Sequence, residues 1–206
     1  MVKSSSNKHW LIRQQKDPYV KQAQQSHYRS RAVYKLIEID EKDHLFKQGQ
    51  TIIDLGAAPG SWSQYVSKKI GKKGRLIAID ILPMDPIANT LFIKGDFTEQ
   101  PVVEQCLQAM NHGKADLVIS DMAPNLSGIG ATDQARSLNL AELSFDLAKS
   151  VLKQGGHMLV KLFEGEGTGV YRRELKEHFG KVIVRKPKAS RDDSREFYVL
   201  ARTFRL

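Results

Sequence analysis

Short apolar runs of strand length recur along this chain between stretches with helical spacing, and this alternation limits the possible folds more than any other feature. The runs cover residues 51–55, 75–81, 90–96, 115–121 and 157–163. The helical patterns that separate most of them cover residues 30–46, 61–70, 98–110, 133–153 and 168–179. Strands that alternate with helices predict an α/β fold with a parallel sheet and helices on both faces.

The final part of the chain modifies this prediction. Residues 182–186 and 196–204 have the pattern of two strands with only a loop between them. We therefore expect one antiparallel strand at or near the edge of the sheet. We also expect Ser30 to cap the first long helix, and Gly155 with Gly156 to end the longest one.

The basic side chains are concentrated at the two ends of the chain. Residues 1–35 hold eight basic side chains and one acidic one, residues 181–206 hold eight and three, and the net charge is +9. A mildly acidic body with two basic ends indicates a polyanion as partner, and nucleic acid is favoured over a membrane surface. We divide the chain into a basic N-terminal arm at 1–28, flexible or a short irregular helix, and a single domain at 29–206.

Several classes of protein are disfavoured by what the sequence lacks. No apolar run is long enough to span a bilayer, and the first residues lack the apolar core of a secretory signal. The single cysteine, Cys106, can form neither an internal disulfide nor a metal cluster. We expect a cytoplasmic protein without a metal, monomeric and without an obligate protein partner.

The loop after the first strand has the composition of a ligand-binding turn. In a doubly wound sheet, ligands bind beyond the carboxyl ends of the strands, and here Gly56 and Gly60 allow close approach of a backbone. The dinucleotide fingerprint G-x-G-x-x-G is absent. Asp54 precedes the first glycine, and it suits a cationic or amide group better than a phosphate.

Acidic residues also end the next two strands. Asp80 is positioned to bind a ribose diol, Asp96 to accept a hydrogen bond from an adenine amino group, and Phe97 to flank the ring. Acidic residues at three successive strand ends favour S-adenosylmethionine over a dinucleotide. The alternative is that the glycines only form a tight turn.

Four further ionisable residues stand where a structural role is costly or unusual. Lys161 lies inside an apolar run, and a lysine in such a place suits a general base. We expect Asp121 and Glu196 to orient Lys161, and Lys35 to tune its pKa. Each residue also has a structural alternative. Lys35 could be exposed on its helix, and Glu196 could form a surface ion pair with Arg195 or Lys186. Asp121 could cap the following turn, and the Lys161 side chain could extend to solvent.

Four motifs together resemble the FtsJ/RrmJ family of RNA ribose 2′-O-methyltransferases. They are DLGAAPGSWSQ, SDMAPN, VKLFEG and SREFYVLA, and the resemblance runs from about residue 26 to the C-terminus. It implies a Rossmann-like class I methyltransferase fold of seven strands, mostly parallel, with the last strand antiparallel. It also implies a catalytic tetrad and a set of cofactor-binding positions. The tetrad falls on Lys35, Asp121, Lys161 and Glu196, with Lys161 as proton acceptor. The cofactor-binding positions fall on Gly60, Trp62, Asp80, Asp96 and Asp121.

The resemblance further implies methyl transfer from S-adenosylmethionine to one uridine of 23S rRNA, on an assembled or nearly assembled large ribosomal subunit. Basic ends would hold the RNA phosphates. Trp10 or Tyr198 is a candidate to stack on a splayed base, and the alternative for each is a place in the core. Three alternatives remain: a non-catalytic RNA-binding protein, a small-molecule methyltransferase, and a cap methyltransferase. The intact motifs weigh against a non-catalytic protein, and the basic ends weigh against a small-molecule methyltransferase. The absence of an extra guanine-binding domain weighs against a cap methyltransferase.

Overall fold

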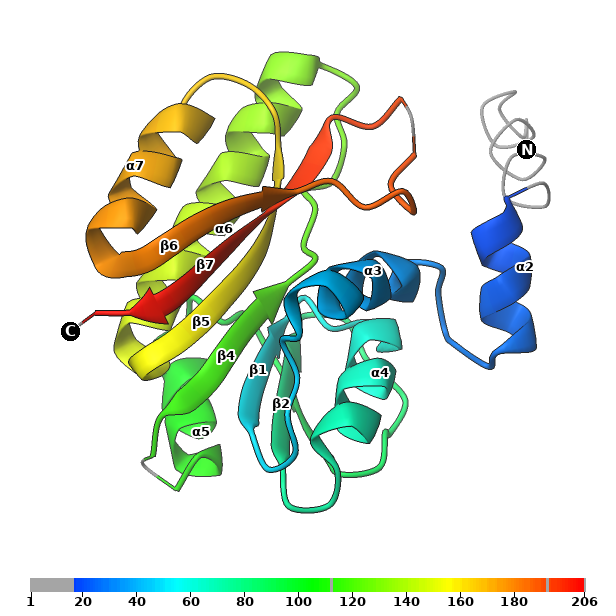
Figure 1. Cartoon of the computed structure of the whole chain (residues 1–206), viewed down its shortest axis with the longest axis vertical. Helices are drawn as coiled ribbons and strands as arrows, with labels where there is room; N and C mark the ends of the chain where they lie inside the picture. Colours follow the sequence, from blue (N-terminus) through cyan, green and yellow to red (C-terminus); the bar gives the residue numbers. More distant parts are fainter. Residues whose placement is uncertain (1–16, 112, 192, 206) are drawn as a thin grey trace.

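The structure is a computed structural model that describes residues 17–111, 113–191 and 193–205. Its centre is a 7-stranded sheet in the order β3-β2-β1-β4-β5-β7-β6 (Figure 1). The strands are β1 (Thr51–Leu55), β2 (Arg75–Asp80), β3 (Thr90–Lys94), β4 (Ala115–Ser120), β5 (Leu152–Phe163), β6 (Phe179–Arg185) and β7 (Glu196–Phe204). The helices are α2 (Pro18–Gln25), α3 (Val33–Asp43), α4 (Ser61–Ile70), α5 (Gln100–Ala109), α6 (Gly130–Val151) and α7 (Thr168–His178).

The direction of the strands confirms the predicted fold class. Strands β1 to β5 pair in parallel, whereas β7 lies between β5 and β6 and is antiparallel to both. The chain runs outward from β1 toward β3 and then returns to add β4 beside β1. The carboxyl ends of β1 and β4 therefore meet where the strand order reverses, which is where such sheets bind ligands.

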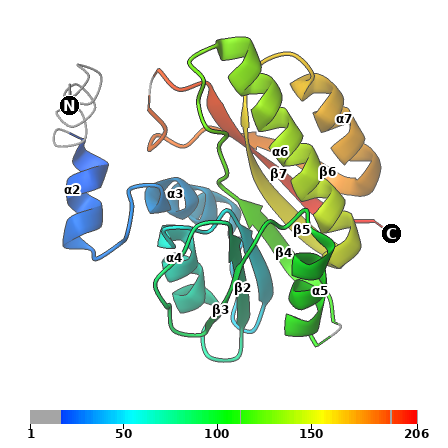
Figure 2. The same ribbon diagram turned by 180° about the vertical axis from the view of Figure 1, so that it is seen from behind.

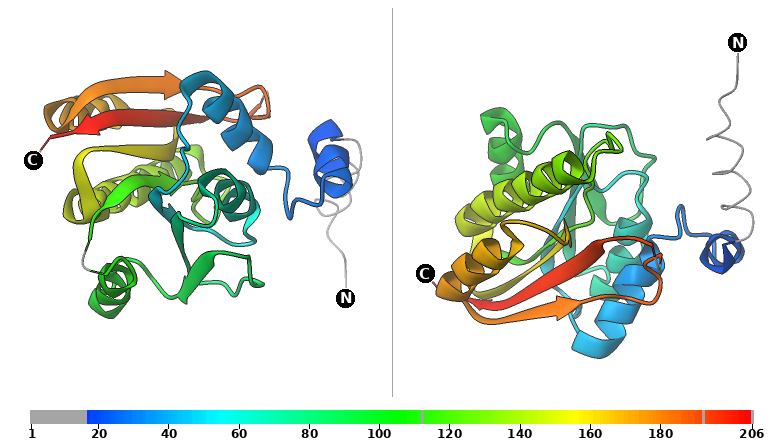
Figure 3. Two further views of the ribbon diagram at one scale, coloured as in Figure 1. Left: turned by 60° about the horizontal axis from the view of Figure 1, so that its bottom comes forward. Right: turned by 90° about the horizontal axis from the view of Figure 1, so that it is seen from above.

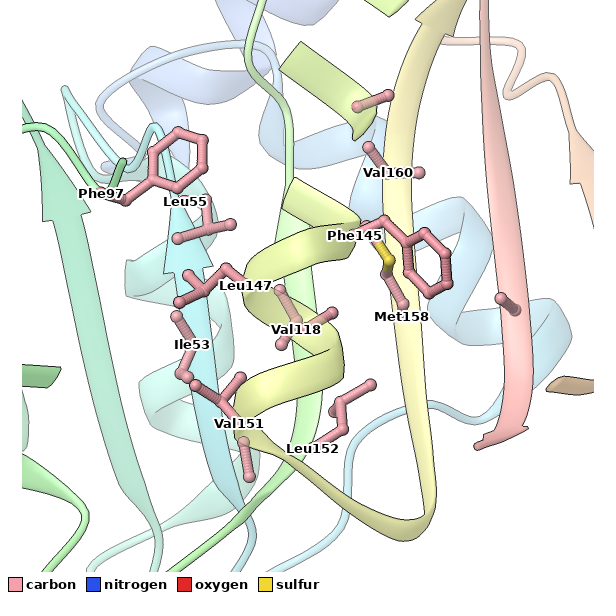
Figure 4. Close-up of a cluster of buried hydrophobic side chains, with 14 of the residues drawn as sticks. Ile53, Leu55, Phe97, Val118, Phe145, Leu147, Val151, Leu152, Met158 and Val160 are labelled. Carbon is pink, nitrogen blue, oxygen red and sulfur yellow. The ribbon is translucent and has the colours of Figure 1, made fainter. Parts of the chain in front are cut away.

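Helices cover both faces of the sheet, as predicted (Figures 2 and 3). Alternate residues of each strand point to opposite faces, so Ile52 packs with α3 and α4 while Ile53 packs with α5, α6 and α7. In Figure 4, Leu147 of α6 lies next to Val118 of β4, and Phe145 of α6 lies next to Met158 of β5. The two apolar clusters fix the strands, and hence the strand ends that carry the polar residues.

Two helix ends differ from the predictions. Helix α3 begins at Val33 with Ala32 as N-cap residue, so Ser30 is not its cap; the Ser30 Oγ instead lies 2.8 Å from the Ser61 Oγ. Helix α6 ends at Val151, and the next residue already belongs to β5. Gly155 and Gly156 therefore lie inside β5, where the register with β4 shifts, rather than ending the helix.

Part of the predicted basic arm is a regular helix. Asp17 caps α2 by accepting a hydrogen bond from the Tyr19 backbone N–H at 3.0 Å. Figure 1 shows α2 beyond α3, away from the sheet, and the rings of Tyr19 and Tyr34 are 5.5 Å apart. Residues 1–16, which include Trp10, lie outside the described residues. Within the described residues, no helix is long and apolar enough to cross a membrane.

Candidate active site

A cavity of about 340 Å³ lies at the carboxyl ends of β1, β2 and β4. Five of the predicted site residues line it, which the topology explains because neighbouring parallel strands end at one edge of the sheet. These are Gly56, Asp80, Asp96, Phe97 and Asp121.

The carboxylates in this cavity are held by backbone groups of the adjoining turns. Asp80 accepts hydrogen bonds from the N–H groups of Ala58 and Leu82, both at 2.8 Å. Asp96 accepts from the N–H of Thr98 at 2.9 Å. These bonds fix the direction of both side chains, so the acidic groups are preorganised for hydroxyl or amino donors.

Glycine is required at the first turn for both space and conformation. Gly56 has φ +71°, and a Cβ there would overlap the Met122 side chain. Gly60 has φ +103°, and a Cβ there would lie 2.8 Å from the Arg29 guanidinium. Gly60 and Trp62 lie beside the cavity rather than in its wall; Trp62 is buried, and its Nε1 donates to the Ala32 carbonyl at 2.9 Å.

Asp54 lies beneath the turn and is only 1% exposed. Its Oδ2 accepts a hydrogen bond from the Ser63 Oγ at 2.6 Å. Burial raises the pKa of the Asp54 carboxyl to about 7, the Ser63 hydrogen bond opposes this, and the nearby Asp121 and Asp80 charges add to it. The predicted acceptor is thus a support of the turn rather than part of the cavity wall.

This raised pKa leads to a prediction about stability. Because the folded state binds the Asp54 proton more tightly than the unfolded state, stability from this group is full below about pH 4 and falls as pH rises toward 7. Asp54→Asn, which stays neutral, is expected to lack this loss, on the order of 4 kcal/mol at most. Urea denaturation of both proteins at pH 4, 5.5 and 8 measures it. A stability difference that does not change with pH would contradict the assignment.

The predicted tetrad forms two buried ion pairs. Lys161 on β5 lies 3.0 Å from Asp121 Oδ1, and its Nζ also donates to the Asp121 carbonyl at 2.5 Å. Lys35 on α3 lies 2.6 Å from Glu196 Oε1. Both lysines are 7% exposed, so an exposed Lys35 and a solvent-directed Lys161 are both wrong. Glu196, at the start of β7, therefore pairs with Lys35 on α3, and neither the predicted contact with Lys161 nor a surface ion pair with Arg195 or Lys186 describes it.

Tyr198 belongs to this network, and it lies in the core, which is the second of its two predicted roles. Its hydroxyl donates to Asp121 Oδ1 at 2.6 Å, and the side chain is fully buried, so stacking on a base is wrong for this residue. Its place two residues after Glu196 on the same strand, hence on the same face, was the available signal. Burial alone would raise the pKa of Asp121, but Lys161, Lys35 and the Tyr198 hydrogen bond together hold it below its ordinary value.

A second cavity, of about 420 Å³, opens next to the first and shares Ala123 with it. Lys35 and Glu196 line it, and Arg31 and Arg191 bring positive charge from the two basic parts of the chain. Asp121 thus lines the first cavity, while Lys35 and Glu196 line the second. Lys161 forms its ion pair with Asp121. Such an arrangement suits a reaction between two bound molecules, with a buried amine near the junction.

Comparisons with known proteins agree with this geometry. The family model described as FtsJ-like methyltransferase matches residues 28–204. The "Ribosomal RNA large subunit methyltransferase E" of Marinobacter nauticus is 53% identical over 206 residues, covering 100% of both chains. That of Pseudomonas aeruginosa is 55% identical, covering 100% of this chain and 99% of its own.

Solved structures give the same fold. The crystal structure of a putative ribosomal RNA methyltransferase from Plasmodium falciparum has a TM-score of 0.77 at 34% identity, and the match covers 86% of this chain and 98% of that one. A putative rRNA methylase from Clostridium thermocellum has a TM-score of 0.53 at 18% identity, covering 82% of this chain and 97% of its own. The second likeness bears on the fold alone.

Proposed function

Because the chain belongs to the FtsJ-like methyltransferase family, we propose that it transfers a methyl group from S-adenosylmethionine to the ribose 2′-hydroxyl of a uridine in 23S rRNA. Full-length relatives at 53% and 55% identity carry the name of ribosomal RNA large subunit methyltransferases, which supports this substrate. The observation that carries the proposal is that Asp121, the partner of the buried Lys161, lines the first cavity and that a second cavity adjoins the first at Ala123.

The acceptor groups and the aromatic ring that line the first cavity suit S-adenosylmethionine. Asp80 suits the ribose diol, and Asp96 and Phe97 suit the adenine. Gly56 brings backbone without a side chain to the cavity wall, where a Cβ would displace Met122. The methyl group would be supplied as a sulfonium substituent, ready for direct displacement. Of the other proposed cofactor residues, Asp54, Gly60 and Trp62 would support the turn from behind or beside it.

Lys161 is proposed as the general base. A ribose hydroxyl is a poor nucleophile until its proton is removed, so the Lys161 Nζ would take that proton as the oxygen bonds to the methyl carbon. Asp121 stabilises the resulting ammonium group at 3.0 Å, and Tyr198 keeps the carboxylate in place. Lys35, held by Glu196, adds positive charge where the ribose and its phosphates would lie.

The RNA is proposed to bind across the second cavity. Arg31 and Arg191 would contact phosphates, which position an RNA without selecting its sequence. We propose that residues 1–28 are a basic arm that contributes to RNA binding and that 29–206 form the methyltransferase domain. The enzyme would act as a cytoplasmic monomer on rRNA within the large ribosomal subunit.

Gly56→Ala is expected to weaken binding of S-adenosylmethionine by about tenfold or more, because the new methyl would collide with Met122 and the left-handed backbone would be strained. Isothermal titration with S-adenosylmethionine measures this. Gly49→Ala is the matched control, because Gly49 has φ +83° but an open surrounding, so it carries the strain without the collision. Equal affinities of the two variants would contradict the predicted fit.

The proposal is tested by transfer of labelled methyl from S-adenosylmethionine to two substrates, naked 23S rRNA and large subunits from cells that lack this methylation. Labelling of either RNA supports the proposal, and the comparison shows which state of the substrate is used. If S-adenosylmethionine binds but neither RNA is labelled, the proposed substrate is wrong, and a non-catalytic RNA-binding role gains support.

A further inference from the structure

The loop that joins β4 to α6 exposes two bulky apolar side chains next to the second cavity. Leu126 is 68% exposed and Ile129 is 63% exposed. Leu126 also forms part of the wall of that cavity, together with Lys35 and Glu196. Exposed apolar side chains that adjoin a binding site are typical of surfaces that contact a ligand.

The Asp133 carboxylate supports the part of the loop that directly follows Leu126. Asp133 Oδ1 accepts from the backbone N–H and the hydroxyl of Ser127, both at 2.7 Å, and Oδ2 accepts from the Gly128 N–H at 3.1 Å. These hydrogen bonds lower the pKa of Asp133, and the side chain is buried. Leu126 therefore stands on a supported turn and is preorganised to project from the surface.

Positive charge flanks this loop on the side of the second cavity. The Arg195 guanidinium lies so near Gly130 that a Cβ on that glycine would be 3.2 Å from Arg195 Nη1. Arg191 lines the cavity itself. An RNA strand bound by these arginines would pass alongside Leu126, so the apolar side chain would meet bases rather than phosphates.

We propose that Leu126 is a wedge that inserts beside the target nucleotide and keeps its base out of the stack, a role that rests on the proposed methylation of RNA. Lys161 is 7% exposed and lies below the surface, so a nucleotide stacked within an RNA helix cannot bring its 2′-oxygen to the amine. The nucleotide must leave the stack, which costs free energy. Apolar side chains pushed between bases compensate for this loss. Leu126 is a positioning residue, because it touches neighbouring bases rather than the reacting atoms.

The test compares Leu126→Ala with wild type on two RNAs under single-turnover conditions. One is 23S rRNA that lacks the methyl group, and the other is the same RNA with an abasic site on the 3′ side of the target uridine, introduced by ligation. The variant is expected to be slower by about 10- to 100-fold on intact RNA, but by only about threefold on abasic RNA, where the stack is already interrupted.

Matched controls separate a wedge from a general effect of the loop. Ile129→Ala removes a similarly exposed side chain of the same loop that does not line the cavity, and Val170→Ala removes one that is 59% exposed on α7. Both are expected to stay within about twofold of wild type, since exposed substitutions change stability little. Equal slowing of Leu126→Ala on both RNAs, or no slowing, would overturn the wedge. A wild-type protein that labels neither these RNAs nor large subunits assembled from them would instead overturn the proposed function.

Discussion

Lys161→Ala is expected to slow methyl transfer by about 10³-fold, the contribution of a well-placed general base. The affinity for S-adenosylmethionine is expected to stay within a few-fold, because Lys161 is not part of the wall of the first cavity. Single-turnover transfer of labelled methyl gives the rate, and equilibrium dialysis gives the affinity. An equal loss of rate and affinity would mean that Lys161 serves only to hold Asp121 in the cofactor site.

Lys161→Arg separates a proton acceptor from a structural cation. Arginine keeps the positive charge opposite Asp121, which lies 3.0 Å from Lys161 in the wild type, but it does not release its proton in proteins. The proposal predicts that Lys161→Arg is as slow as Lys161→Ala while its melting temperature stays closer to that of wild type. Recovery of activity by arginine would contradict the role of a base.

Asp121→Asn is expected to impair both cofactor binding and methyl transfer, whereas substitutions of Lys161 are expected to impair methyl transfer alone. Asp121 lines the first cavity, pairs with Lys161 and accepts the Tyr198 hydroxyl at 2.6 Å. Loss of its charge leaves a buried lysine without its counterion, so we expect about 10²-fold or more loss in kcat. Cofactor affinity should fall as well, by about tenfold, since one acidic group of the cavity is lost.

The matched control for this prediction lies on β4, the strand that Asp121 directly follows. Asp116 is an acidic residue near the start of β4 that pairs with Lys153 and accepts the Thr51 N–H at 2.7 Å. Asp116→Asn is expected to cost some stability but to leave kcat and cofactor affinity near those of wild type. Steady-state kinetics and titration on both variants make the comparison. If Asp116→Asn matched Asp121→Asn, loss of a carboxylate from β4 would act through the fold rather than through the site.

The parts of the fold that follow from hydrophobic periodicity were predictable. The boundaries of β1, α4 and β7 match the predicted ranges, because apolar side chains at strand or helix spacing must face a core. The prediction for the end of α6 was wrong, because the chain enters strand β5 at Leu152. Gly155 and Gly156 lie in an irregular part of that strand. Tertiary pairing, rather than a local glycine signal, decides that boundary.

The site was predictable to a similar depth. The topology of parallel strands brings Asp80, Asp96 and Asp121 to one edge of the sheet, so their common cavity follows from the sequence pattern. The pairing of Lys35 with Glu196 does not follow from the sequence pattern, because these residues are far apart in the chain. Their contact depends on where α3 lies relative to β7. For Tyr198 base stacking was wrong and the core alternative was right, but the hydrogen bond from its hydroxyl to Asp121, just after β4, depends on tertiary packing in the same way.

The central claim is the identity of the atom that receives the methyl group. The most direct measurement digests the labelled 23S rRNA to nucleosides and locates the methyl by mass spectrometry, with Lys161→Arg treated in parallel. The account predicts a single 2′-O-methyluridine in the wild-type reaction and essentially none with Lys161→Arg. A methyl group on a base, or a 2′-O-methyluridine formed equally well by Lys161→Arg, would contradict it.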